Sequence, residues 1–460
     1  MLDTIRRGFE RFGFLPVETP AFELTDVLLT KSGGETEKQV YFVQSTGSIK
    51  QSDAGKQGDA GLPELALRFD LTVPLARYVA EHEHALNFPF RRYQIQRVYR
   101  GERAQKGRYR EFYQCDIDVI GKDSLALAYD AEVPAVIHGI FRELAFGPFT
   151  IYLNNRKLLR GLLESLGFAD DQHTTVLHEV DRVGKQPAAE IAARLVSLLA
   201  GGGEVAAVME DHVPEAIAPI APIAPIGARV TRLFELLTAH DGDSRAAFEA
   251  LRRFEAPNPT FTEGLDELQR VYDGTLALGV PERALQLKLS IVRGLDYYTG
   301  TIYETLLDDH PKLGSICSGG RYENLAGHYT KSRLPGVGIS IGATRLFSQL
   351  LERKVIGATR AAVAHVLVLA VEPALAADCA RMAAELRDAG FNVEVYGGDD
   401  KLGKQLKYAD RSKIPLALIY GSREQAAGIV KVKDLRESAV TKEHDTPRGE
   451  LVLHIKQLVG

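Results

Sequence analysis

The chain has 460 residues, of which 45% are hydrophobic and 25% charged, and its formal net charge is −5 at pH 7. This balance is typical of a globular protein of about two to four domains, and it excludes a protein that coats nucleic acid by bulk attraction. The cysteines Cys115, Cys317 and Cys379 lie far apart, which excludes a disulfide framework and a CxxC zinc site and fits a reducing cytosol. No apolar run approaches the ~18 residues that a membrane span needs.

The first predicted element is a helix over residues 2–12. Four apolar residues recur there at helical spacing, and Asp3 favours a helix start. Residues 14–23 follow as an extended segment punctuated by two prolines. Residues 31–63, rich in Gly, Ser, Lys and Gln, predict a connection around one short strand at Val40–Val43.

The run from Leu65 to Ala80 predicts a buried strand that leads through Asp70 and Thr72 into a helix. Pro74 lies where the first turn of a helix tolerates proline. The Asp70 carboxylate has two readings, because it could cap this helix or belong to a binding site.

Two predicted strands flank a loop rich in arginine, lysine and glycine between Phe90 and Gly121. Alternation predicts an antiparallel pair with one face in the core and one wet, polar face. The polar face carries Arg100 at one end and Gln114, Asp116 and Asp118 at the other. The loop adds cations, spaced by glycines, that suit closure on phosphates: Arg103, Lys106, Arg108 and Arg110. A solvated hairpin and a site for a zwitterion beside a polyanion both fit this pattern.

Residues 124–166 predict structural elements of the core rather than site residues. A helix, a strand and a second helix are predicted at Ser124–Leu144, Phe149–Asn154 and Arg156–Leu166. From about residue 171 to residue 265 the sequence is helical and rich in Ala and Leu, which indicates an inserted domain.

Two glycine-containing stretches follow the insertion. Leu287–Glu304 has the apolar, β-branched content of a strand, interrupted by glycines, and it reads either as a core strand with packed tyrosines or as part of a site. Residues 336–347 predict a small-residue strand that runs into a helix near Ala343, with Arg345 in the first helical turn.

The C-terminal part forms a separate predicted unit after a short linker. Four apolar strands alternate there with helical segments, which predicts a small α/β domain with largely parallel strands. The strands are His365–Val371, Phe391–Tyr396, Pro415–Gly421 and Ile429–Leu435.

These stretches resemble the motifs of class II aminoacyl-tRNA synthetases in their histidyl form. Residues 98–118 resemble motif 2, with Arg100 and Glu102 at its arginine and glutamate and GRYREFYQ from Gly107 onward. RGLDYY at residues 293–298 is typical of the histidyl family.

Three further stretches strengthen the resemblance. DLTVPLAR from Asp70 is similar to a histidyl-family segment, and residues 336–347 resemble motif 3, with Thr344 where many relatives carry glutamate. The first helix and the extended segment resemble motif 1, which builds the family's homodimer interface. Family members usually carry a short segment ahead of that helix, and this sequence begins at the helix, through a late-placed start or a truncation.

The resemblance implies an α/β protein with an α+β catalytic core built on an antiparallel sheet. The implied domains are the catalytic core in two parts, 1–170 and 266–355, a helical insertion at 171–265, and an α/β anticodon-binding domain at 362–460.

The resemblance also implies a role for each site residue. Arg100 and Arg293 are the implied catalytic cations. The implied histidine-binding residues are Asp70, Thr72, Gln114, Asp118, Tyr297, Tyr298 and Tyr322. The implied ATP-binding residues are Arg100, Glu102, Arg108, Phe112 and Arg345. Lys106 and Arg108 are expected to close over pyrophosphate, and Gln105 to read the tRNA acceptor end.

The implied function is that of a cytoplasmic, homodimeric histidine–tRNA ligase that uses L-histidine, ATP and tRNA(His). Mg²⁺ is expected with ATP, through ligands that the sequence does not identify, whereas zinc, an organic cofactor and a membrane are not expected. The alternative is a catalytically inactive paralogue that serves as regulatory subunit of ATP phosphoribosyltransferase. Such a paralogue typically lacks the C-terminal domain and erodes the motif 2 loop and Arg293, and this chain retains all three.

Overall fold

The computed structural model describes residues 1–29, 40–46, 63–101, 107, 109–184, 186–199, 225–292, 298–324, 326–327, 329–358, 360–436 and 442–459. The chain forms two compact units, Met1–Ile356 and Gly357–Gly460. Among the described residues, no helix has both the length and the apolar character that crossing a membrane would require.

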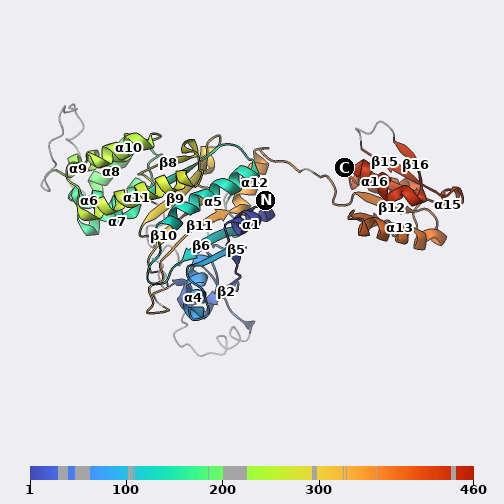
Figure 1. Ribbon diagram of the computed structural model, residues 1–460, viewed down its shortest axis with the longest axis horizontal. Coiled ribbons are helices and arrows are strands. Elements are labelled where there is room, and N and C mark those ends of the chain that lie inside the picture. The colour runs from blue at the N-terminus through green and yellow to red at the C-terminus, as the bar shows by residue number, and fades with distance from the viewer. Residues whose placement is uncertain are drawn as a thin grey trace. The chain divides into compact units, whose positions relative to one another are not determined.

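The first unit is built around an eight-stranded sheet with the strand order β1-β5-β6-β11-β10-β9-β7-β8 (Figure 1). The outer pairs β1–β5 and β7–β8 are parallel, and the pairs between them are antiparallel. In chain order the strands are β1 Leu15–Pro16, β5 Phe90–Tyr99, β6 Glu111–Ile120, β7 Phe149–Asn155, β8 Leu285–Leu287, β9 Thr301–Leu307, β10 Cys317–Tyr322 and β11 Gly336–Gly342. The predicted fold class, an antiparallel-sheet core with a separate α/β unit, is confirmed.

The strands β5 and β6 form the predicted antiparallel pair, but they are not a solvated hairpin. β6 lies between β5 and β11 inside the sheet, so both of its edges are hydrogen-bonded. Cys115, Ile117 and Val119 face the apolar core, as alternation predicts. The opposite, polar face is also buried rather than wet, because Asp116 and Asp118 are at most 3% exposed.

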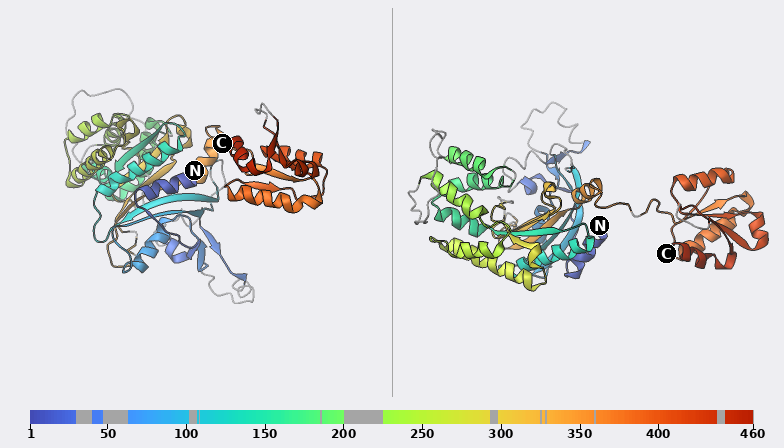
Figure 2. Two further views of the ribbon diagram at one scale, coloured as in Figure 1. Left: turned by 45° about the vertical axis from the view of Figure 1, so that its right-hand side comes forward. Right: turned by 90° about the horizontal axis from the view of Figure 1, so that it is seen from above.

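Helices cover the apolar face of the sheet and one of its ends. α5 crosses the sheet, and the helices from α6 to α11 gather beyond one end of it (Figures 1 and 2). One continuous hydrophobic core joins these helices to the sheet, so the domain boundaries at residues 171 and 265 remain a prediction. The helices are α1 Leu2–Arg11, α5 Ala128–Leu144, α6 Arg156–Ser165, α7 Asp170–Val180, α8 Ala188–Leu199, α9 Ile226–Thr238, α10 Ser244–Arg252, α11 Pro259–Ala277 and α12 Ala343–Glu352.

A three-stranded sheet with the order β2-β4-β3 lies next to β5 and β6 of the large sheet (Figure 1). Its strands are β2 Phe22–Leu24, β3 Tyr41–Val43 and β4 Leu65–Leu67, and the helices α2 Thr25–Leu29 and α4 Thr72–His82 pack with it. Since β4 runs almost directly into α4, Asp70 and Thr72 lie at the junction of the two elements.

The strand content predicted for Leu287–Glu304, with interruptions at its glycines, is confirmed at both ends, whereas the described residues 288–292 and 298–300 lie outside the strands. β8 ends at Leu287 and β9 begins at Thr301, and β7 lies between these two strands in the sheet. The side-chain amide of Asn154 donates to the carbonyl oxygens of Leu289 and Ile291 at 2.9 and 2.8 Å. The side chain of Asn154 thus satisfies two backbone carbonyl groups at the point where the chain turns away from the sheet after β8.

The second unit carries a five-stranded sheet with the order β13-β12-β14-β15-β16. Three of the four predicted strands, β13, β12 and β14, are parallel to one another, as expected, whereas β15 pairs antiparallel with β14 and with the unpredicted β16. The stretch between β14 and β15 is too short for a parallel crossover, which needs a dozen or more residues. The elements are β12 Val366–Ala370, α13 Ala376–Asp388, β13 Val393–Val395, α14 Leu402–Arg411, β14 Leu416–Tyr420, α15 Ser422–Ala427, β15 Ile429–Asp434, β16 Glu443–Pro447 and α16 Leu451–Val459.

Candidate active site

A cavity of about 500 Å³ lies on the polar face of the eight-stranded sheet. β6 lines it with Phe112, Gln114, Asp116 and Asp118, which lie two residues apart and therefore share one face of the strand. The strands β10 and β11 contribute small residues, and the junction of β4 with α4 closes another side. The cavity is thus built from segments that are far apart in the sequence.

Antiparallel pairing aligns residues of β5, β6, β11 and β10 in two rows across this face. One row consists of Arg92, Asp118, Gly338 and Gly320, and the next consists of Gln94, Asp116, Ser340 and Ser318. The charged side chains therefore lie on β5 and β6, and the floor beside them is made of glycine and serine. A ligand on that floor can approach the sheet backbone closely and form polar contacts with the carboxylates beside it.

Gly338 is required at its position by the side chain opposite it. A Cβ atom there would lie 2.3 Å from Asp118 Oδ1 and 2.2 Å from the carbonyl oxygen of Ile117. Both distances are far shorter than real contacts allow. Only glycine leaves room for the Asp118 carboxylate at this point of the floor.

Asp118 is held from two sides within the cavity wall. Its Oδ2 forms an ion pair with Arg92 Nη2 at 2.5 Å, and its Oδ1 accepts a hydrogen bond from the Tyr322 hydroxyl at 2.9 Å. Burial raises the pKa of the Asp118 carboxyl, against the opposing effects of Arg92 and Tyr322. A carboxylate fixed in this way presents an acceptor in one defined orientation.

Arg92 is a functional candidate that the sequence analysis missed. Its side chain is fully buried, and its Nε and Nη1 atoms have no hydrogen-bond partner among the described residues. Alternation could have found it, because Arg92 shares its parity with Gln94 and Gln96 on the polar face. We infer that Arg92 holds Asp118 and supplies positive charge beneath the cavity.

Asp70 accepts a hydrogen bond at the start of a helix and also lines the cavity, which are the two roles that the sequence left open. Its Oδ1 accepts a hydrogen bond from the Val73 N–H at 3.2 Å, as a capping carboxylate does at the start of α4. Asp70 and Thr72 also line the cavity, and burial raises the pKa of Asp70 to about 6. Across the cavity, Gln114 Nε2 donates to Ser340 Oγ at 2.6 Å. The structure therefore brings Asp70, Thr72 and Gln114 to one cavity.

Asp116 lines the cavity between Gln114 and Asp118, although no role was predicted for it. It is 2% exposed, and its Oδ1 has no hydrogen-bond partner among the described residues. Burial raises the pKa of Asp116 to about 7, although Arg92 and Ser340 lower it, and the neighbouring Asp118 raises it further.

This raised pKa predicts a dependence of stability on pH. Between pH 4 and pH 7 the folded protein holds a proton on Asp116 that the unfolded chain releases, so the free energy of unfolding falls as pH rises. In urea denaturation, we expect the wild type to lose about 2–3 kcal/mol more than Asp116→Asn between pH 5 and pH 8. Equal pH dependence in the two proteins would show that Asp116 titrates at its ordinary pKa.

Arg100 and Phe112 lie together in the cavity lining, close to the junction of β4 with α4. Arg100 Nε donates to the carbonyl oxygen of Phe69 at 3.1 Å, and its guanidinium carbon lies 5.1 Å from the centre of the Phe112 ring. The backbone bond and the aromatic face fix the plane of the guanidinium. Its charge is therefore available to an anion in the cavity.

Arg345 enters the cavity from the first turn of α12, as predicted. Its Nη2 donates to the carbonyl oxygen of Leu313 at 2.5 Å. The adjacent Thr344 hydroxyl accepts a hydrogen bond from the Tyr113 N–H at 2.9 Å, which ties the start of α12 to β6. The threonine that departs from the motif 3 pattern thus has a structural role here.

Tyr298 and Tyr322 also line the cavity, so the structure brings both tyrosines to the predicted site. The remaining predicted site residues lie outside the described part of the chain and stay predictions: Glu102, Gln105, Lys106, Arg108, Arg293 and Tyr297.

Among the described residues, no group of three or more His, Cys, Asp or Glu side chains could hold a metal ion. The cysteines are buried free thiols, and burial raises the pKa of both Cys115 and Cys317.

An antiparallel sheet that lines one cavity with both arginines and carboxylates has the arrangement of the catalytic core of a class II aminoacyl-tRNA synthetase. The family model described as histidyl-tRNA synthetase matches residues 1–346, and the one described as anticodon binding domain matches residues 365–458. The chain belongs to the histidyl-tRNA synthetase family.

Individual relatives agree with this assignment over nearly the whole chain. The histidine–tRNA ligase of Xanthomonas oryzae pv. oryzae is 54% identical, covering 99% of this chain and 94% of that protein. The histidine–tRNA ligase of Stenotrophomonas maltophilia is 53% identical with the same coverage. The crystal structure of histidyl-tRNA synthetase from Nostoc sp. PCC 7120 superposes with a TM-score of 0.80 at 36% identity, covering 99% of this chain and 94% of that one.

Proposed function

We propose that this chain is a histidine–tRNA ligase, which activates L-histidine with ATP and transfers it to the 3′ end of tRNA(His). The observation that carries the proposal is the cavity itself. It offers carboxylates and an amide for an amino acid, and arginines for phosphates, within one lining. Membership of the histidyl-tRNA synthetase family and relatives named histidine–tRNA ligase support it over the regulatory paralogue.

The proposed amino-acid subsite is centred on Asp118. Its carboxylate accepts a hydrogen bond from a ring nitrogen of histidine, and Tyr298, Tyr322 and the predicted Tyr297 shape the pocket around the ring. Asp70, Thr72 and Gln114 bind the α-ammonium group. A site built to satisfy imidazole hydrogen bonds rejects analogues that leave its buried polar groups unpaired.

In the first step the histidine carboxylate attacks the α-phosphorus of ATP, a new oxygen–phosphorus bond forms, and pyrophosphate leaves. Two anions must meet, so cations and positioning supply most of the catalysis. We assign the reacting groups to Arg100 and the predicted Arg293. Arg345 and Phe112 hold the nucleotide, Glu102 and Arg108 complete the ATP contacts, and Lys106 with Arg108 closes over pyrophosphate.

In the second step the activated acyl group passes to a ribose hydroxyl of tRNA, and AMP leaves. We propose that Gln105 contacts the acceptor end, that residues 171–265 form the insertion and that residues 362–460 bind the anticodon. Mg²⁺ is proposed to arrive with ATP, with no protein ligand assigned. We also propose that the protein acts as a homodimer in the cytoplasm.

Histidine-dependent exchange of labelled pyrophosphate into ATP tests the function directly. We expect exchange with histidine and none with the other amino acids, followed by transfer to tRNA(His). A folded protein that supports no exchange would overturn the ligase function and favour the regulatory paralogue.

A further inference from the structure

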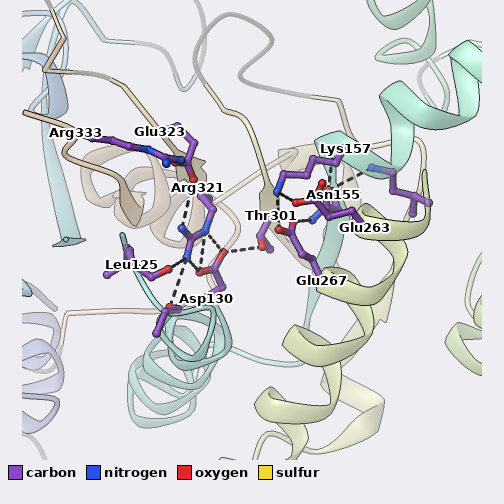
Figure 3. A network of polar contacts seen from close by, with 12 residues as sticks. Leu125, Asp130, Asn155, Lys157, Glu263, Glu267, Thr301, Arg321, Glu323 and Arg333 are labelled. Atoms are coloured by element: carbon purple, nitrogen blue, oxygen red, sulfur yellow. Dashed lines mark hydrogen bonds and ion pairs between the residues drawn. The ribbon is translucent and has the colours of Figure 1, made fainter. Parts of the chain in front are cut away.

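A buried ion pair lies on the face of the sheet opposite the cavity, between α5 and β10. Arg321 Nη2 lies 2.6 Å from Asp130 Oδ2, and Arg321 Nε lies 3.0 Å from Asp130 Oδ1 (Figure 3). Asp130 is fully buried and Arg321 is 6% exposed. Two parallel bonds of this kind fix the orientation of a guanidinium as well as its position.

Arg321 lies between two residues that line the cavity. Gly320 and Tyr322 are its neighbours on β10, and alternation places their side-chain positions on the opposite face from Arg321. The Tyr322 hydroxyl donates to Asp118, and a Cβ on Gly320 would lie 2.9 Å from the ring of Tyr298. The position of Arg321 therefore sets the position of both tyrosines of the proposed histidine pocket.

The same pair anchors the segment that follows Tyr298. The Thr301 hydroxyl donates to Asp130 Oδ1 at 2.7 Å, and the Thr299 N–H donates to the carbonyl oxygen of Arg321 at 2.8 Å. A Cβ on Gly300 would lie 2.9 Å from Arg321 Cδ, so this segment runs directly along the arginine side chain. Of the three residues after Tyr298, Thr301 therefore bonds to the ion pair itself, Gly300 runs beside the arginine side chain, and Thr299 bonds to the arginine backbone.

A second polar cluster flanks Thr301 on its other side. Asn155 pairs with Thr301 in the register of β7 and β9, and its amide donates to Glu267 on α11 at 2.9 Å (Figure 3). Lys157 bonds to the same Glu267 at 2.6 Å. Residues on α5 and α11 therefore both hold the strands on which Thr301 and Asn155 lie. A change at Asp130 should thus alter the Thr301 segment, because the neighbouring strand is itself held in place.

Stability alone does not account for a pair of this kind. Removing two charges from water costs free energy that their attraction only offsets when the geometry is good, and apolar replacements of similar volume are often as stable. An ion pair does, however, specify orientation, which packing of apolar groups specifies less sharply.

We propose that Asp130 and Arg321 are positioning residues for the amino-acid pocket, which hold Tyr298 and Tyr322 in place and so set the affinity for histidine rather than for ATP. This inference rests on the proposed function. Neither residue touches substrate, since both act from the far face of the sheet.

The test uses variants that separate positioning from folding. Asp130→Asn combined with Arg321→Gln removes both charges together and keeps an acceptor for the Thr301 hydroxyl, so no buried charge is left unpaired. Thr301→Val keeps both charges and removes the hydroxyl that links Asp130 to the segment after Tyr298. Arg333→Gln is the matched control, because Arg333 pairs with Glu323 on the surface, at the outer end of the network that reaches Arg321 Nη1 at 3.6 Å, and does not contact Asp130 (Figure 3).

In pyrophosphate exchange, we expect the double variant to raise the KM for histidine roughly tenfold and the KM for ATP less than about twofold, with a near-normal thermal midpoint. Thr301→Val should raise the KM for histidine about threefold, and Arg333→Gln should change neither KM. Normal KM values for histidine in folded variants would overturn the proposal, as would equal rises for both substrates. Should the double variant not fold, Thr301→Val alone decides between these outcomes.

Failure of the proposed function is distinguishable from failure of this inference. If the wild type supports no exchange, the ligase function fails. The dissociation constant of histidine, measured by calorimetry on the same proteins, then tests the positioning role by itself. An unchanged constant in Thr301→Val would reject it.

Discussion

Replacing Arg100 with alanine is expected to reduce histidine-dependent pyrophosphate exchange by a factor of about 10²–10³, the usual loss when one preorganised group that stabilises transition-state charge is removed. Arg100 lines the cavity with its guanidinium held by the Phe69 carbonyl oxygen and the Phe112 ring. The group is therefore oriented before substrate binds. Its loss leaves the carboxylate and the α-phosphate to meet with less positive charge between them.

The hydrogen bond of Arg100 to Phe69 and its contact with the Phe112 ring contribute about 1–2 kcal/mol to folding, so most of the expected loss of exchange is in catalysis. Arg97→Ala is the matched control, since Arg97 lies three residues earlier near the end of β5, is 53% exposed and pairs with Glu111 on the surface. An exposed pair of this kind contributes about 0–1 kcal/mol, and we expect normal exchange from that variant. Arg100→Lys should lie between alanine and the wild type, because lysine keeps the charge but loses the planar fork. Normal exchange from Arg100→Ala would remove Arg100 from the reaction.

The polar face of β6 could be predicted from the sequence because alternation is a local property. Gln114, Asp116 and Asp118 share one face, as two-residue spacing requires. The residues that complete the floor could not be predicted in the same way. Gly338 lies opposite Asp118 only because β11 pairs with β6 in one particular register, which depends on the whole fold.

The burial of Arg92 shows a second limit of sequence reasoning. Alternation puts Arg92 on the polar face, but an arginine is exposed by default, so the sequence favours a solvated side chain. The structure instead buries it completely against Asp118. That pairing follows from the strand register, in which residues 92 and 118 lie opposite each other.

The elements that the sequence misjudged lack a clear apolar signal or depend on their neighbours. β16 spans Glu443–Pro447, whose residues are mostly polar or charged, so no hydrophobic alternation marks it as a strand. Leu287–Glu304 has strand composition throughout, yet among its described residues those in the sheet are at its two ends. After β8 the side chain of Asn154 donates hydrogen bonds to the carbonyl oxygens of Leu289 and Ile291, which strand pairing would otherwise satisfy. No local sequence pattern predicts that contact.

Asp118→Asn is expected to raise the KM for histidine about 100-fold, with a smaller effect on the KM for ATP. The proposed contact joins a ring nitrogen of histidine to a buried carboxylate, and such charge-assisted hydrogen bonds are worth about 1.5–3 kcal/mol. Asparagine keeps the shape of the side chain and can still accept from the Tyr322 hydroxyl. The loss therefore reports the charge of Asp118 rather than a cavity.

The same substitution leaves Arg92 buried without its partner, so we also expect the free energy of unfolding to fall by about 3–5 kcal/mol. Adding Arg92→Gln removes the unpaired charge and should restore much of this stability, while the KM for histidine stays high. Asp123→Asn is the control, because Asp123 is exposed and adopts a left-handed conformation with φ 65° that asparagine tolerates. A double variant that recovers both stability and histidine affinity would mean that Asp118 serves the fold alone. Recovery of stability without affinity would leave the carboxylate as a direct contact of the imidazole ring, with Arg92 as the group that makes its burial tolerable.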